Sequence, residues 1–238
     1  MERDIKVKIC GITTEEEAGW LSEEQVEYAG FVIWENSKRF ITVEGAKEIF
    51  DKLNPDIKKV AVTVSPDEAL VEEIEAAGFD ILQVHGTLTE EVIKTAHIPI
   101  WRAVNISGIE QLEEIRTEFT RADYPGAGKI TAVLADAKEY GSGKTFGWED
   151  FSSRKEASEE QERLQRIFAE FRKALKKQQI DFILAGGLTP DNVQKGMTIF
   201  VPDVLDVSSG VERESGDTTG TPGKDRKKIR RFVQSVRM

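Results

Sequence analysis

The stretch Ile5-Lys6-Val7-Lys8-Ile9-Cys10-Gly11 lies near the start of the chain and decides how the rest of the sequence is interpreted. Apolar and polar side chains alternate along it, which is the period of a β-strand, and Gly11 ends the run. Lys8 therefore shares a face with Cys10, the only cysteine among 238 residues. Thr13-Thr14-Glu15-Glu16 follows as a capping box, which predicts a helix start. The pattern predicts a strand that ends in a thiol; a buried, unreactive cysteine is the alternative interpretation.

The same strand–helix unit recurs along the whole chain. Short apolar runs predict further strands at 28–34, 59–64, 80–85, 98–104, 130–135, 181–185 and 204–207, with helical patterns between them. This alternation predicts an α/β protein, a (β/α)8 TIM barrel that forms a single domain over residues 1–238. An open doubly wound sheet is the alternative, but the Gly-x-Gly-x-x-Gly fingerprint of its dinucleotide-binding version does not follow the first strand.

Two charged segments and one capping motif predict further helices. The extended segment at about 152–180 predicts a long helix whose apolar stripe packs on the sheet. A second helix start, Ser65-Pro66-Asp67-Glu68, predicts Ser65 as N-cap and Pro66 as the first helical residue. The basic run at 224–228 is interpreted as the solvated face of the last helix, which Asp225 caps.

Composition narrows the classes of partner. The formal net charge is −10, with 39% hydrophobic and 32% charged residues, which is typical of a globular protein that does not bind nucleic acid. No apolar run reaches the ~20 residues that a membrane span needs, and the first residues lack the apolar core of a signal peptide. One cysteine cannot form an internal disulfide, so we expect a cytoplasmic protein with no membrane partner.

In a barrel of this kind, functional groups gather at the carboxyl ends of the strands. Strand parity predicts that the candidate side chains there face the barrel axis; they are Lys8, Cys10, Gln83, His85, Asp136, Asp206 and Ser208. Asp136 is the strongest candidate for a general acid, because it ends an apolar strand where desolvation raises a carboxyl pKa. A helix N-cap or a partner of Lys144 is the alternative. Cys10 can act as a base only as thiolate, and Lys8 is the candidate helper unless it pairs with an acid such as Asp206.

The turns after the last two strands predict an anion site. Gly186-Gly187 permits close backbone approach, and Ser208-Ser209-Gly210 offers N–H groups and hydroxyls at the positions where barrels often bind phosphate. Ordinary strand-to-helix turns are the alternative. Arg39 is a candidate clamp for a carboxylate or a solvated arginine. His85 is either a ligand-binding group or a satisfied polar group. No residues have metal-ligand spacing, so no metal is expected.

Motifs along nearly the whole chain resemble those of the phosphoribosylanthranilate isomerase family. They are Lys8–Thr13, Gly30-Phe31-Val32, Ser37–Phe40, Gln83–Gly86, Asp136, Gly141–Phe146, Leu184–Pro190 and Asp206–Glu212, in the family's order. The resemblance implies a cofactor-free (β/α)8 enzyme of tryptophan biosynthesis that performs an Amadori rearrangement of N-(5-phosphoribosyl)anthranilate. It implies Cys10 as general base and Asp136 as general acid. It further implies contact between Arg39 and the anthranilate end, and phosphate binding at Gly186, Gly187, Ser208 and Ser209.

The remaining expectations concern partners and departures. We expect a small phosphoribosyl substrate, substrate contacts from Lys8, Gln83, His85 and Asp206, and a monomer or homodimer. A barrel that isomerises another phosphoribosyl compound, a non-catalytic phosphosugar-binding barrel or pathway-assembly partner, and a thiol-redox sensor are the alternatives. The sequence departs from the family in its long 151–181 stretch, in the extended spacer at 213–221, and in the alanines that flank Asp136.

Overall fold

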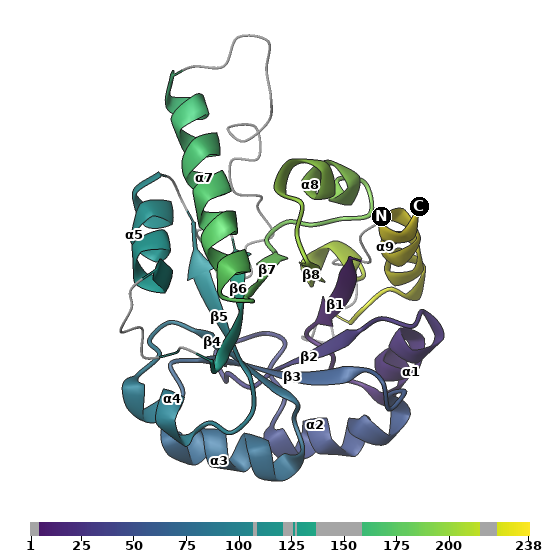
Figure 1. The fold of residues 1–238 in the computed structure, drawn as a ribbon. Helices are drawn as coiled ribbons and strands as arrows, with labels where there is room; N and C mark the ends of the chain where they lie inside the picture. The colour runs from purple at the N-terminus through teal and green to yellow at the C-terminus, as the bar shows by residue number, and fades with distance from the viewer. Residues whose placement is uncertain (1–4, 107–108, 121–125, 127, 137–158, 215–222) are drawn as a thin grey trace.

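Eight parallel strands close into a barrel in which each strand pairs with its neighbours in sequence and β8 pairs with β1 (Figure 1). The computed structural model describes residues 5–106, 109–120, 126, 128–136, 159–214 and 223–238. The strands are β1 (Lys6–Cys10), β2 (Tyr28–Val32), β3 (Lys58–Val64), β4 (Ile81–His85), β5 (Ile100–Asn105), β6 (Ile130–Asp136), β7 (Asp181–Leu184) and β8 (Val204–Val207). The predicted (β/α)8 architecture is therefore confirmed, and the doubly wound alternative is wrong.

Helices cover the outside of this barrel (Figure 1). They are α1 (Glu15–Glu23), α2 (Val43–Ile49), α3 (Glu68–Ala77), α4 (Glu90–Thr95), α5 (Ile109–Thr120), α7 (Glu159–Lys177), α8 (Val193–Phe200) and α9 (Arg226–Arg237), with short 3-10 helices at Phe50–Lys52 and Ser209–Val211. Asp225 caps α9 as predicted, because its side chain accepts from Lys228 N. Within the described ranges, no helix is both long and apolar enough to cross a membrane.

The prediction for the start of α3 is wrong. Asp67, not Ser65, is the N-cap, and its carboxylate accepts from Leu70 N at 2.9 Å. Ser65 instead extends the sheet, because its N–H donates to His85 O at 2.9 Å, and its φ is +48°. Its hydroxyl accepts from Thr87 N at 2.9 Å, so this serine joins the loops after β3 and β4.

Two apolar cores follow from the period-2 alternation of the strands. One set of side chains, including Val7, Ile9 and Phe31, packs between the barrel and its helices. The other fills the barrel, where the rings of Tyr28 and Trp101 meet edge to face with centroids 4.8 Å apart. Cys10 belongs to this inner set, so the thiol points into the barrel as predicted.

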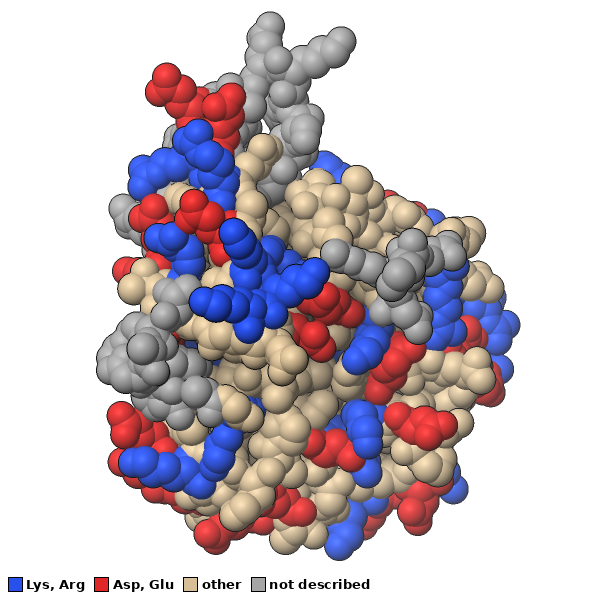
Figure 2. Space-filling view, in the orientation of Figure 1, with Lys and Arg blue, Asp and Glu red and all other residues tan. Residues whose placement is uncertain are grey.

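Helix α7 carries the predicted apolar stripe. Ile167, Phe168, Phe171 and Leu175 are buried, and Phe168 meets Phe182 of β7 with ring centroids 5.5 Å apart. The first residues of the predicted 152–180 segment, up to 158, lie outside the described residues. On the face shown in Figure 2, acidic and basic side chains are interspersed, and several of both signs lie over α7.

Candidate active site

A cavity of about 460 Å³ lies at the carboxyl ends of the strands. Every candidate that the sequence predicts for this mouth lines it, with Lys8 as the exception: Cys10, Arg39, Gln83, His85, Asp136, Gly186, Gly187, Asp206, Ser208 and Ser209. The segment after β2 adds Trp34, Asn36, Ser37 and Lys38 to the lining, and apolar residues complete it. Residues from β1, β4, β6 and β8 thus open into one cavity, although they are far apart in the sequence.

Cys10 ends β1 and is 8% exposed. Gly30 of β2 makes room for it, because a Cβ at Gly30 would lie 3.0 Å from Cys10 Sγ and 3.1 Å from Lys8 Cε. Burial raises the pKa of the Cys10 thiol, and the negative charge of Asp206 adds to this rise. Lys8, Lys224 and Arg39 oppose it without outweighing burial. The predicted help from Lys8 therefore acts in the expected direction and is smaller than the cost of desolvation.

Lys8 lies beneath the cavity and forms a buried ion pair. Its Nζ is 2.9 Å from Asp206 Oδ2, and the lysine side chain is fully buried. Register explains the contact, since Lys8 and Asp206 are paired residues of β1 and β8. Burial works against the charged lysine, but Asp206 and Cys10 raise the pKa of Lys8 above its ordinary value. Pairing with an acid, the alternative that the sequence left open, is what the structure shows.

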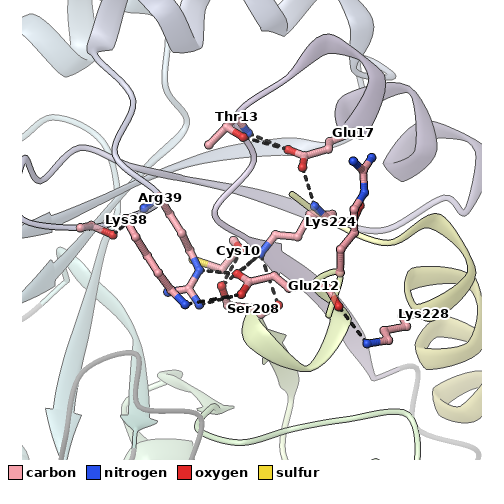
Figure 3. Close-up of polar contacts among 11 residues, drawn as sticks. Cys10, Thr13, Glu17, Lys38, Arg39, Ser208, Glu212, Lys224 and Lys228 are labelled. Atoms are coloured by element: carbon pink, nitrogen blue, oxygen red, sulfur yellow. Dashed lines mark hydrogen bonds and ion pairs between the residues drawn. The ribbon is translucent and has the colours of Figure 1, made fainter. Parts of the chain in front are cut away.

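Arg39 is held by a carboxylate of the loop after β8 (Figure 3). Its Nε is 2.5 Å from Glu212 Oε1, and its Nη2 donates to Glu212 Oε2 at 3.2 Å. Lys224 Nζ is 3.1 Å from the same Glu212 Oε1. Burial tends to raise the pKa of Glu212, but Arg39 and Lys224 lower it below the ordinary value. Arg39 is 6% exposed, so the solvated-arginine interpretation is wrong.

The two predicted phosphate turns touch each other. A Cβ at Gly210 would lie 1.8 Å from Leu188 O, so only glycine permits this approach between the β7 and β8 loops. Gly186 and Gly187 adopt positive φ values of 81° and 64°, which side chains other than glycine disfavour. The hydroxyl of Ser208 is already engaged, because it donates to Cys10 O at 2.8 Å.

Gln83 and His85 form the neutral part of the lining. Their Nε2 atoms lie 2.9 Å apart, so His85 accepts through Nε2 in its neutral form. Burial, with smaller effects of Lys8 and Arg102, lowers the pKa of His85 to about 3. The imidazole is therefore neutral at physiological pH, and it cannot serve as a cationic anion-binding group.

Asp136 ends β6, which β7 and β8 separate from β1 in the closed barrel, and it lines the same cavity as Cys10. It pairs in register with Asn105 of β5, and its backbone O accepts from Ile106 N at 3.4 Å. Leu134, two residues earlier on the same face, also lines the cavity. The glycine-rich segment Gly141–Phe146, with the alternative Asp136 partner Lys144, lies outside the described residues. Among the described residues, no group of three or more His, Cys, Asp or Glu side chains is arranged to hold a metal ion.

Sequence reasoning missed the buried ion cluster around Glu212. Glu212 was quoted as the last residue of a family motif but given no role, and Lys224 was assigned to a solvated helix face. That assignment is wrong for Lys224, which is fully buried. The signal was present, because Lys224 precedes the N-cap Asp225 and is therefore not on the helix at all.

A closed parallel barrel with a cavity at the carboxyl ends of its strands defines a class of protein, the (β/α)8-barrel proteins, whose active sites lie at that end of the barrel. Comparison with known proteins identifies the group within this class. The sequence model described as N-(5'phosphoribosyl)anthranilate (PRA) isomerase matches residues 7–235. The chain belongs to this family and is therefore an isomerase of tryptophan biosynthesis, as the resemblance implied.

Relatives align with this chain over nearly its full length. The N-(5'-phosphoribosyl)anthranilate isomerase of Streptococcus mutans is 36% identical over 234 residues, which covers 98% of both chains. The crystal structure of the Thermus thermophilus phosphoribosyl anthranilate isomerase is similar with a TM-score of 0.72 and 27% identity, over 98% of each chain. Monomers generated from the dimeric Thermotoga maritima enzyme give the same TM-score, identity and coverage.

Proposed function

We propose that Cys10 is the general base and Asp136 the general acid in the rearrangement of N-(5'-phosphoribosyl)anthranilate to 1-(2-carboxyphenylamino)-1-deoxyribulose 5-phosphate. The observation that carries this proposal is that β1 and β6 bring Cys10 and Asp136 to one cavity. A sugar placed between them would meet a proton donor at one side and a proton acceptor at the other. General acid–base catalysis of this kind contributes about 10²–10⁴-fold to a rate.

The reaction balances with these two groups. Asp136 donates a proton to the ribose ring oxygen, the bond from that oxygen to C1 breaks, and the nitrogen lone pair forms the C1=N bond of a protonated Schiff base. That bond acidifies the proton on C2, so a base as modest as the Cys10 thiolate can remove it. The C2–H electron pair forms C1=C2 while the C1=N pair returns to nitrogen, which gives an enol. C1 then takes up the proton held by Cys10, the C2 hydroxyl gives its proton to the Asp136 carboxylate, and the C2 ketone forms. No oxidant, reductant or co-substrate is required.

Candidate binding groups surround the space between Cys10 and Asp136. We assign the phosphate to the turns at Gly186-Gly187 and Ser208-Ser209, where backbone N–H groups can approach it closely. Arg39 is assigned to the anthranilate carboxylate, because Glu212 holds its guanidinium at the cavity. Held at a distance from the reacting carbons, both anions would fix the orientation of the sugar.

Two buried acceptors suit the sugar hydroxyls. Asp206 Oδ1 and Gln83 Oε1 are buried and have no hydrogen-bond partner in the part of the chain that the structure describes. Unpaired buried acceptors are costly, and a substrate hydroxyl would satisfy either one. Lys8 then acts from beneath the cavity by fixing Asp206, and His85 acts as a neutral polar group beside Gln83.

The rest of the proposal concerns the whole chain. We assign residues 1–238 to one barrel domain that works in the cytoplasm, without nucleic-acid or membrane partners, on the basis of the barrel, the lone cysteine and the net charge of −10. The relative from Thermotoga maritima is described as dimeric, which supports a homodimer over a monomer for this chain. Light scattering of the purified protein distinguishes the two states.

The experiment that tests the function follows the anthranilate-type fluorescence of the substrate as the purified protein consumes it. Cys10→Ser should lower kcat by about 10²-fold or more with a much smaller change in KM, because a hydroxyl is a far weaker base than a thiolate. Thermal unfolding of the same variant is the control for folding. Wild-type protein that binds the substrate without turning it over would instead support the phosphosugar-binding barrel. Undiminished kcat in Cys10→Ser would remove the thiol from its role.

A further inference from the structure

Lys224 is a charged side chain that the proposed mechanism does not use. It lies between the 3-10 helix Ser209–Val211 and α9, and it is 0% exposed. Burying an ammonium group costs several kcal/mol after relaxation, so buried lysines are rare unless they are paired. Lys224 has such a partner in Glu212, but the pair borders the active site and not an ordinary core.

The Lys224 ammonium group reaches Cys10 through a single serine (Figure 3). Its Nζ lies 3.2 Å from Ser208 Oγ and 3.3 Å from Ser208 O. An ammonium group can only donate, so Ser208 Oγ accepts from Lys224 and uses its own hydrogen for Cys10 O at 2.8 Å. The hydrogen bonds therefore run in one direction, from the Lys224 ammonium group to the Ser208 hydroxyl and from there to the backbone carbonyl of Cys10.

Both ends of Lys224 are fixed. Its backbone N–H donates to Glu17 Oε1 at 2.6 Å, while the other oxygen of Glu17 accepts from Thr13 N at 2.8 Å, in the loop after Cys10. An isolated antiparallel bridge pairs Lys224 with Glu212, which explains why their side chains meet. The ammonium group is therefore held in place against the β1 loop.

Among the described residues, the charged groups that act on Cys10 and their partners include more cations than anions. Lys8 and Asp206 pair one to one, whereas Arg39 and Lys224 share the single carboxylate of Glu212. Burial raises the pKa of Cys10 and Asp206 raises it further, while Lys8, Lys224 and Arg39 lower it. Burial, with a smaller effect of Arg39, lowers the pKa of Lys224 below its ordinary value, although Glu212 and Cys10 act in the opposite direction.

We propose that Lys224 is a positioning residue of this isomerase: held by Glu212, its ammonium group fixes Ser208 against Cys10 and supplies positive charge that stabilises the Cys10 thiolate. The inference rests on the proposed role of Cys10 as base. It also gives Ser208 a task besides phosphate binding, because the serine hydroxyl hydrogen is committed to Cys10 O.

The test measures the ionisation of Cys10 directly. Because the chain has one cysteine, the pH dependence of its alkylation by iodoacetamide reports that thiol alone. Lys224→Met removes both the charge and the donors, and Lys224→Gln removes the charge but keeps a donor. Both should move the alkylation profile to higher pH by about one unit, which lowers the thiolate fraction near neutral pH about tenfold. The low-pH limb of the kcat/KM profile, which reports ionisation of the base, should move to higher pH with it, and kcat should fall more than KM changes.

The matched control is Lys228→Met. Lys228 Nζ donates to Glu212 O at 2.9 Å from the outer side of the same loop, and its side chain is 34% exposed. This variant should leave the Cys10 profile where it is in the wild type. An unshifted profile in a folded Lys224→Met or Lys224→Gln variant overturns the proposal. Alkylation needs no substrate, so a wild-type chain without turnover would count against the proposed function and leave this result intact.

A second measurement applies if neither Lys224 variant folds. Coupling between two titrating groups is reciprocal, so Cys10→Ser should lower the pKa of Lys224. NMR titration of isotope-labelled lysine side chains in wild type and Cys10→Ser detects this change. Lys8 and Lys224 should both respond, since both contribute to the Cys10 environment. A response from Lys8 alone overturns the proposal.

Discussion

The two walls of the mouth cavity differ in their charge. The wall formed by β1, β8 and the segments after β1, β2 and β8 carries a cluster of buried ions, which are Lys8, Arg39, Asp206, Glu212 and Lys224. The wall formed by β6 and β7 presents Asp136 among Leu134, Ala185 and the glycines that follow. Nearby cations favour the ionised form of a thiol, which is the form that can act as a base, whereas apolar surroundings favour the protonated form of a carboxyl group, which can act as an acid. Among the described residues, this difference agrees with the roles that we propose for Cys10 and Asp136.

The largest expected effect is on the charged wall. Asp206→Asn removes the partner of Lys8, whose Nζ is fully buried, and leaves an unpaired cation in the barrel. Breaking a buried pair in this way costs about 3–5 kcal/mol of unfolding free energy. Denaturant unfolding measures the loss. Glu90→Gln is the control, because its pair with Lys94 is exposed and should cost about 0.5 kcal/mol or less. Equal losses in the two variants would show that the buried ion pair contributes no more to the unfolding free energy than the exposed one.

The next largest effect is expected on the opposite wall. Asp136→Asn keeps the shape of the side chain but removes its transferable proton, so kcat should fall by about 10²-fold or more. Steady-state fluorescence kinetics measure the loss, and KM should change little. Asp181→Asn is the matched control, because Asp181 begins β7, at the far end of the barrel from the cavity. Comparable kcat in Asp136→Asn and the wild type would remove Asp136 from its proposed role as general acid.

The sequence predicts the strand residues of both walls better than it predicts the contacts made by their loops. Alternation along a strand and the carboxyl-end rule placed Cys10, Asp136 and Asp206 in one cavity, because both depend on local period and on closure of the barrel. The Lys8–Asp206 pair was one of two open alternatives, and the β1–β8 register decides it.

The Glu212–Lys224 pair was not predictable in the same way. It depends on an isolated bridge between two loop residues, and no sequence period describes such a contact. Ser65 shows the same limit on a smaller scale. Its motif predicts an N-cap, but a hydrogen bond to His85 O keeps it in the sheet. Tertiary contacts of loops override local motifs at both positions.

His85 gives a pH test of the neutral part of the lining. Its pKa of about 3 lies below the ordinary value, mainly because of burial, so the folded chain stays unprotonated there while the unfolded chain binds a proton below about pH 6.5. The contribution of His85 to stability is therefore full above that pH and declines as the pH falls towards 3. NMR of the two histidine rings should show no titration of His85 between pH 5 and 8. A His85 midpoint near 6.5 would contradict the buried, neutral assignment.

The smallest effect is expected at the edge of the charged wall. Lys38 lines the cavity, but its Nζ is 3.9 Å from Glu212 Oε2 and its side chain is 56% exposed. Exposed pairs contribute about 0–1 kcal/mol, so Lys38→Ala should change kcat/KM by about fivefold at most, and this change should shrink with added salt. Steady-state kinetics at two salt concentrations measure it, with Lys52→Ala, from an exposed pair with Glu15, as the control. A loss as large as that of Asp136→Asn would mean that the solvent-facing rim, and not only the buried ions beneath it, sets the charge of this wall.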